Sequence, residues 1–327
     1  MEKESHFRYE KLEGPLAEKY MKANTHLHFS GFLKVYPSGC TVSANYPYHA
    51  ERIRHLTVRP DDVWIITYPK CGTTWTQEMV WLLMNNLDYE TAKNVDQTER
   101  SPFLEFGTFH KPGSEDKRGN SVDIVDDMKS PRCIKSHLPL DLLPEQLWTV
   151  KPKIIYVARE PKDVAASFYH HHRRSFCYTG TSEDFVEAFI AGIVGAGDQW
   201  DHTLRFWEKR KEPNVLFNTF EEMKKDLPGV VQRTAKFLNC TLNSEQLDKL
   251  CEHLSFESMK NNPAVSHETE QSKEHAENNA KVIGKIEPFI RKGEVGGWKS
   301  DIAPEVASKI DKWTEEKLKN TDYTIPS

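Results

Sequence analysis

The strongest constraint on the fold is a strand, a loop and a helix that follow one another between residues 63 and 85. Val63 to Thr67 are all apolar or β-branched, which is typical of a parallel strand buried on both faces. Large apolar side chains then recur at helical spacing between Thr73 and Asn85; these are Trp75, Met79, Leu82 and Leu83. A strand that enters a helix through a short loop is the building unit of α/β proteins.

The same alternation continues along the chain. We expect further strands at 133–136, 154–158 and 214–217, and helices at 163–172, 185–207, 228–239, 246–254 and 309–318. This order predicts a three-layer α/β fold with a central parallel sheet. We expect the 327 residues to form a single domain, with residues 1–60 irregular and packed on the body as an extended N-terminal segment. The polar stretches 110–131 and 262–284 predict a flexible insertion and a mobile loop.

The loop Tyr68-Pro69-Lys70-Cys71-Gly72-Thr73-Thr74-Trp75 is predicted to bind an anion, as a P-loop does. A helix start offers free backbone N–H groups and the positive end of the helix dipole. Gly72 lets the backbone approach the anion, and Lys70 adds a positive charge. For this loop alone, a capped helix start with an exposed lysine remains the alternative. The pattern G-x-x-x-x-G-K-[ST] is absent, which disfavours a nucleotide kinase.

Three further segments carry the residue types that group transfer needs. Lys135 and His137 end a predicted strand two positions apart, so they face the same way and suit a charge stabiliser and a general base. Arg159 follows the next strand, eight residues before Ser167, and can clamp a second anion. The stretch from Phe289 to Lys299 alternates cations and glycines and can wrap a phosphate.

Together and in this order, the four segments resemble the cytosolic sulfotransferase family over residues 60–300. The resembling motifs are Tyr-Pro-Lys-x-Gly-Thr-Thr-Trp, Lys-x-His-Leu-Pro, Val-Ala-Arg with Lys-Asp-Val-Ala-x-Ser, and Arg-Lys-Gly-x-x-Gly-x-Trp-Lys. Cys71 and the stretch 59–64 look like the insect branch, which includes a retinol dehydratase. The resemblance implies transfer of a sulfuryl group from 3′-phosphoadenosine-5′-phosphosulfate (PAPS) to the hydroxyl of a small phenol or alcohol. The nucleotide product would be adenosine 3′,5′-bisphosphate (PAP), and no metal is implied. Composition alone does not separate sulfuryl from phosphoryl transfer.

The resemblance also implies residue roles. His137 is expected to be the base, Lys70 to stabilise the leaving phosphate, and Lys135 to stabilise the transferring group. The residues expected to bind the donor are Lys70, Cys71, Gly72, Thr73, Thr74, Trp75, Arg159, Ser167, Phe220, Phe256, Arg291, Lys292 and Gly293. Within that set, Trp75 and Phe256 are expected to sandwich the adenine. The residues expected to hold the 3′-phosphate are Arg159, Ser167, Arg291, Lys292 and Gly293.

The acceptor is harder to derive from the sequence. Aromatic residues suggest a hydrophobic acceptor site, although core packing explains them almost as well; the candidates are Phe103, Phe106, Phe109, His137, Tyr169 and Phe176. An alternative within the scaffold is a dehydratase, which would act on an allylic alcohol such as retinol through a sulfated intermediate. A catalytically silent nucleotide or small-molecule binding protein is a further alternative.

The chain departs from the family pattern at several positions. Phe220 stands where relatives often carry Tyr, and Leu254 where they carry Thr, so we expect a weaker set of adenine hydrogen bonds. The family's dimer motif is degraded at Ala303, Pro304 and Ser308, which puts a family-type homodimer in doubt.

Composition excludes several other classes. The net charge is −5 and no run of five basic residues occurs, so we expect no nucleic-acid partner. No stretch reaches the ~18 apolar residues of a membrane helix. The six cysteines form no C-x-x-C pair and the first residues carry no apolar signal core, so we expect a cytoplasmic protein without a zinc ribbon. The run 170–172 is three consecutive histidines, which cannot share one helix face, and we expect no metal there.

Overall fold

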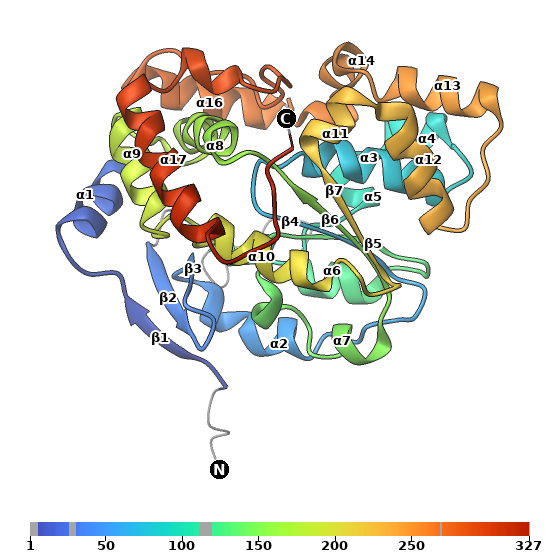
Figure 1. The fold of residues 1–327 in the computed structure, drawn as a ribbon, viewed down its shortest axis with the longest axis horizontal. Coiled ribbons are helices and arrows are strands. Elements are labelled where there is room, and N and C mark those ends of the chain that lie inside the picture. Colours follow the sequence, from blue (N-terminus) through green and yellow to red (C-terminus); the bar gives the residue numbers. More distant parts are fainter. Residues whose placement is uncertain (1–5, 26–30, 111–119, 269, 327) are drawn as a thin grey trace.

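A parallel sheet forms the centre of the computed structural model, which describes residues 6–25, 31–110, 120–268 and 270–326 (Figure 1). The strand order is β5-β4-β6-β7, with β4 at Val63–Thr67, β5 at Cys133–Ser136, β6 at Lys153–Ala158 and β7 at Val215–Thr219. Ile66 is in register with Ser136 on one side and Tyr156 on the other. The loops that follow β4, β5 and β6 therefore leave the sheet at the same edge, and the predicted parallel sheet is confirmed.

Alternate residues of these strands enter two separate hydrophobic clusters, which explains why the strands are apolar throughout. Trp64 and Tyr156 point into one cluster, and Ile65 and Val157 into the other. Helices α3 (Thr73–Met84), α12 (Leu227–Phe237) and α13 (Ser244–His253) cover the face of Ile65. Helices α8 (Pro161–Phe176), α9 (Ser182–Ile190), α10 (Gln199–Lys209) and α17 (Pro304–Leu318) cover the face of Trp64. The protein thus has the predicted three layers (Figure 1).

Shorter helices complete the connections. They are α4 (Tyr89–Asn94), α5 (Gln97–Arg100), α6 (Ser121–Asp127), α7 (Leu147–Val150), α11 (Phe220–Lys225) and α14 (Phe256–Asn261), with 3-10 turns at Tyr46–Tyr48, Phe106–Phe109, Leu140–Leu142 and Gly297–Ser300. In the described part of the chain, no helix is both long and apolar enough to cross a membrane.

Within the first 60 residues, the described ranges 6–25 and 31–60 are more ordered than the sequence suggests. They form an antiparallel sheet of β1 (Arg8–Lys11), β2 (Phe32–Tyr36) and β3 (Cys40–Ser43), together with α1 (Pro15–Ala23) and α2 (Ala50–Arg54). Pro37 and Gly39, which argue for irregular chain, instead lie in the tight turn between β2 and β3. Phe32 and Val35 are buried in the same cluster as Trp64.

Three other segments also differ from expectation. The predicted loop 262–284 is largely helical, with α15 at Pro263–Ser266 and α16 at Glu270–Ile283. Asn279 explains why this polar segment is held, because its side chain is buried and donates to the Arg174 carbonyl at 2.7 Å. The predicted helix 185–207 is split into α9 and α10 by a turn at 191–198, where Asp198 caps α10. In the predicted insertion 110–131, residues 111–119 lie outside the described part, and residues 121–127 form α6.

Candidate active site

The predicted anion loop joins β4 to the amino end of α3. Gly72 has φ 98°, a conformation that favours glycine, and Lys70 adopts φ 70°. The hydroxyls of Thr67 and Thr73 lie 2.7 Å apart and close the base of the loop. The first backbone N–H groups of a 12-residue helix thus meet at the end of the central strand, which is a favourable place for an anion.

His137 lies beside this loop because β5 is parallel to β4. Its Nδ1 is 2.8 Å from the carbonyl oxygen of Thr67, which can only accept, so Nδ1 carries the proton. Nε2 is then the nitrogen with a free lone pair. Burial, followed by the charge of Lys135, lowers the pKa of His137 well below its usual range. The side chain is therefore a neutral imidazole of fixed tautomer, as a general base requires.

Glu105 fixes the backbone of this histidine, and sequence reasoning missed it. Its carboxylate accepts from the His137 N–H at 2.6 Å and from the Ser136 hydroxyl at 2.9 Å. Burial raises the pKa of Glu105 to about 7, although both hydrogen bonds oppose the rise. A single acidic residue within the apolar stretch 102–106 was the available signal.

Positive charge is concentrated around the loop. Burial lowers the pKa of Lys70 to about 7, and repulsion from Lys135, Arg159 and Arg291 adds to the effect. Burial also lowers the pKa of Lys135 to about 8, against the attraction of Glu105. Mutually repelling, half-buried cations are a favourable environment for an anionic group.

The second predicted anion site lies between β6 and the C-terminal loop. Arg159 donates to the carbonyls of Lys70 at 3.2 Å and Glu294 at 2.9 Å, and its Nε has no partner among the described residues. Arg291 and Lys292 both bind Asp301, at 2.8 and 3.0 Å. The cations predicted to hold a phosphate thus share one wall.

Asp163, at the start of α8, ties the C-terminal loop to this wall. Its two carboxylate oxygens accept from the backbone N–H groups of Gly296 at 2.7 Å and Trp298 at 2.9 Å. The site is therefore assembled from segments more than 130 residues apart in sequence.

The predicted adenine region is aromatic and tight. Trp75 and Phe220 meet edge to face at 5.7 Å, and the guanidinium of Arg159 lies 4.0 Å from the Phe220 ring. The buried Nε1 of Trp75 has no partner among the described residues. Gly293 packs so closely on Phe256 that a Cβ there would meet the ring at 2.5 Å. An unpaired indole donor and a glycine that admits an aromatic ring both fit a nucleotide base.

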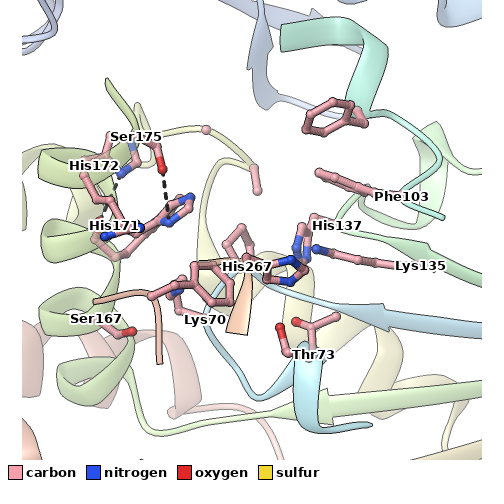
Figure 2. Close-up of a pocket in the computed structure, with 18 of the residues that line it drawn as sticks. Lys70, Thr73, Phe103, Lys135, His137, Ser167, His171, His172, Ser175 and His267 are labelled. Atoms are coloured by element: carbon pink, nitrogen blue, oxygen red, sulfur yellow. Dashed lines mark hydrogen bonds between the residues drawn. The ribbon is translucent and has the colours of Figure 1, made fainter. Parts of the chain in front are cut away.

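The anion loop, the Lys135–His137 pair, the cationic wall and the predicted adenine region all contribute residues to the lining of one cavity of about 2040 Å³. At its other end, aromatic side chains form a continuous row of contacts. The ring centres of Phe103 and His137 are 5.1 Å apart, those of Phe109 and Phe103 are 6.0 Å apart, and those of Phe176 and Phe109 are 6.2 Å apart. The sequence predicts the acceptor site at these aromatic residues, so we call this end the acceptor compartment. In the view of Figure 2, Phe103, Lys135 and His137 lie on one side of the cavity, and His171, His172 and Ser175 on the opposite side.

Most predicted residues line this cavity, including Phe106 and Ser167, but two do not. Tyr169 packs against the core beside Tyr178 and Phe185, away from the acceptor compartment. The Cys71 side chain is fully buried beneath the loop. The structure adds Phe289, His171 and His267 to the lining. Sequence reasoning placed Phe289 only in the segment predicted to wrap a phosphate, and it gave the two histidines no catalytic or binding role.

The comparisons with known proteins agree with this geometry. The sequence model of the sulfotransferase domain matches residues 60–322. This chain is a member of the sulfotransferase family. It is 40% identical to luciferin sulfotransferase of Photinus pyralis, over 86% of this chain and 78% of that protein. It is 37% identical to sulfotransferase 1 family member D1 of Rattus norvegicus, over 83% of this chain and 87% of that protein.

Solved structures give the same result. A retinol dehydratase in complex with retinol and PAP matches with a TM-score of 0.87 and 32% identity, over 98% of this chain and 99% of that one. A mouse sulfotransferase complexed with PAP matches with a TM-score of 0.65 and 26% identity, over 87% of this chain and 93% of that one. The chain is therefore a PAPS-dependent sulfotransferase that acts on a small-molecule acceptor.

Proposed function

We propose that this sulfotransferase moves the sulfuryl group of PAPS to the hydroxyl of a small hydrophobic phenol or alcohol bound in the acceptor compartment. The observation that carries the proposal is His137, a neutral imidazole with its proton held on Nδ1, in the same cavity as Lys70 and Lys135. Its Nε2 is free to take the proton of an acceptor hydroxyl.

The two lysines act on the charge that moves during transfer. PAPS supplies a sulfuryl group whose leaving oxygen becomes a phosphate oxygen, so negative charge grows there as the S–O bond breaks. In this proposal, Lys70 of the anion loop contacts that oxygen, and Lys135 contacts the oxygens of the sulfuryl group. Fixed cations in a site shielded from water stabilise such charge more than water does.

The remaining residues hold the donor. Gly72, Thr73 and Thr74 are proposed to bind the 5′-phosphate through the helix start. Arg159, Ser167 and the segment Arg291–Gly293 are proposed to bind the 3′-phosphate, and Trp75, Phe220 and Phe256 the adenine. All of these residues line the same cavity, which supports this assignment.

The test is transfer of labelled sulfate from PAPS to a panel of phenols and alcohols, followed by mass spectrometry. We expect labelled sulfate esters of apolar hydroxyl compounds. Binding of PAP without label on any acceptor would contradict the proposal. The likeness to a retinol dehydratase favours one alternative, dehydration of an allylic alcohol, which the same spectra would show as loss of water.

The same proposal includes a cytoplasmic location without nucleic-acid or membrane partners. It also includes a homodimer that is weaker than the one typical of the family. Ala303 and Pro304, which replace part of the family's dimer motif, lie at the start of α17. Sedimentation of the purified protein tests the oligomeric state, and a stable dimer at micromolar concentration would contradict the last of these points.

A further inference from the structure

Two imidazoles in the acceptor compartment have no role in the chemistry proposed above. His171 lies on α8, and His267 follows the last turn of α15. The Phe289 ring contacts both, at 6.1 Å from His171 and 4.7 Å from His267, and the Lys70 ammonium lies 4.3 Å from the same ring. A single aromatic ring, Phe289, therefore contacts both histidines and also Lys70 of the anion loop; His171, His267 and Lys70 are labelled in Figure 2.

Their polar atoms are available to a ligand. His171 Nδ1 is 3.5 Å from the Ser175 hydroxyl, at the limit of a hydrogen bond. Within the described ranges, neither His171 Nε2 nor either ring nitrogen of His267 has a hydrogen-bond partner. A bound acceptor hydroxyl can supply such a partner.

The backbone holds His267 in place. Its φ of 53° is left-handed, a conformation that residues other than glycine seldom adopt. The next residue, Glu268, accepts from Arg174 at 3.0 Å and from the Phe289 N–H at 3.1 Å. The imidazole is thus carried by a fixed turn that joins α8, α15 and the C-terminal loop.

Both rings are neutral. Burial and then Lys70 lower the pKa of His171 well below its usual range. Burial and then Lys135 lower the pKa of His267 to about 4. A neutral imidazole donates from one nitrogen and accepts at the other, so it binds a hydroxyl without burying a net charge.

We propose that His171 and His267 form a second polar anchor, and that the preferred acceptors are flat aromatic molecules with two hydroxyl groups. One hydroxyl would face His137 and the other would bind the two imidazoles, with the apolar rings between Phe103, Phe109 and Phe176. This inference rests on the proposed function, because it takes His137 as the base and the aromatic end of the cavity as the acceptor site.

The test compares acceptors that differ by one hydroxyl, 4,4′-dihydroxybiphenyl with 4-hydroxybiphenyl and 2,6-dihydroxynaphthalene with 2-naphthol. We expect the unmodified enzyme to prefer at least one of the diols by about tenfold in kcat/KM, the scale of one hydrogen bond in a shielded site. In His171→Phe and His267→Phe, which keep the ring and remove the nitrogens, that preference should fall towards the twofold statistical value. The change should lie mainly in KM for the diol.

Conservative variants separate hydrogen bonding from shape. His171→Gln and His267→Asn keep a donor and an acceptor, so they should restore part of the preference. PAP binding, measured by calorimetry, verifies that each variant is folded. The ratio of kcat/KM for the diol to kcat/KM for the single phenol cancels any loss of activity that affects the two acceptors equally. An enzyme that sulfates the single phenols without preferring either diol would overturn the inference, as would a preference that survives both Phe substitutions. If no phenol is sulfated at all, the proposed function itself fails.

Discussion

Gly293→Ala tests whether Phe256 supports the adenine. The φ of Gly293 is 60°, and an added Cβ would lie 2.5 and 2.8 Å from two Phe256 ring carbons, so the ring has to move. The backbone conformation costs alanine about 1–2 kcal/mol. Loss of one base–aromatic stack costs about 1–3 kcal/mol, and ~1.4 kcal/mol is tenfold in affinity. We expect PAP to bind about 10- to 100-fold more weakly to the variant than to a strain-matched control.

Gly296→Ala is that control. Gly296 has φ 75° and nothing within 4 Å of its added Cβ, so the variant carries the strain without the collision. Calorimetric titration with PAP gives the affinity of each variant, and thermal unfolding gives its stability. The reasoning is supported if the two variants lose similar thermal stability while Gly293→Ala loses much more affinity for PAP than Gly296→Ala does. Equal affinity losses in the two variants would refute it and remove Phe256 from the adenine site.

Three further predictions follow from the site and the core. His137→Ala should lower the transfer rate by about 10²- to 10⁴-fold with PAP affinity largely kept; turnover near the unmodified rate would show that the base is another group. The pKa of Lys70 is about 7 in the free protein, and a bound phosphate favours its charged form, so PAP binding should take up as much as one proton near pH 8 and weaken as pH rises above 7. Calorimetry in buffers of different ionisation enthalpy measures this uptake. It should fall in Lys70→Met, which leaves only the contribution of Lys135, whose pKa is about 8. Asp62→Ala should cost about 3–5 kcal/mol in urea unfolding, because it removes the buried partner of the fully buried Arg132 and leaves only the exposed carboxylate of Asp126, 3.9 Å away. Lys285→Ala, in an exposed pair, should cost less than about 1 kcal/mol, and equal costs would contradict the burial argument.

The sequence predicted the central sheet correctly, and it also picked out the anion loop that the structure places at the end of β4, for a physical reason. Strands buried on both faces have to be apolar throughout, and the loop at 68–75 combines glycine, cation and helix start in one short stretch. Each of these signals is local.

The parts that sequence reasoning missed depend on contacts between distant segments. The polar helix α16 is held by Asn279 against α8, which no local pattern reveals. Glu105 acquires its role only because β5 brings Ser136 and His137 next to it. Tyr169 is aromatic and near the site in sequence, yet its helix turns it into the core.

The two hydrogen bonds of Asp163 have a consequence for how the protein is made. A ribosome makes the anion loop long before it makes Gly296 and Trp298, which Asp163 fastens. Until then Arg159 lacks the Glu294 carbonyl, and the cationic wall lacks Arg291 and Lys292. A nascent chain that has not reached Trp298 therefore carries only part of the proposed donor site. PAPS should stabilise such a chain less than it stabilises one that includes the C-terminal loop.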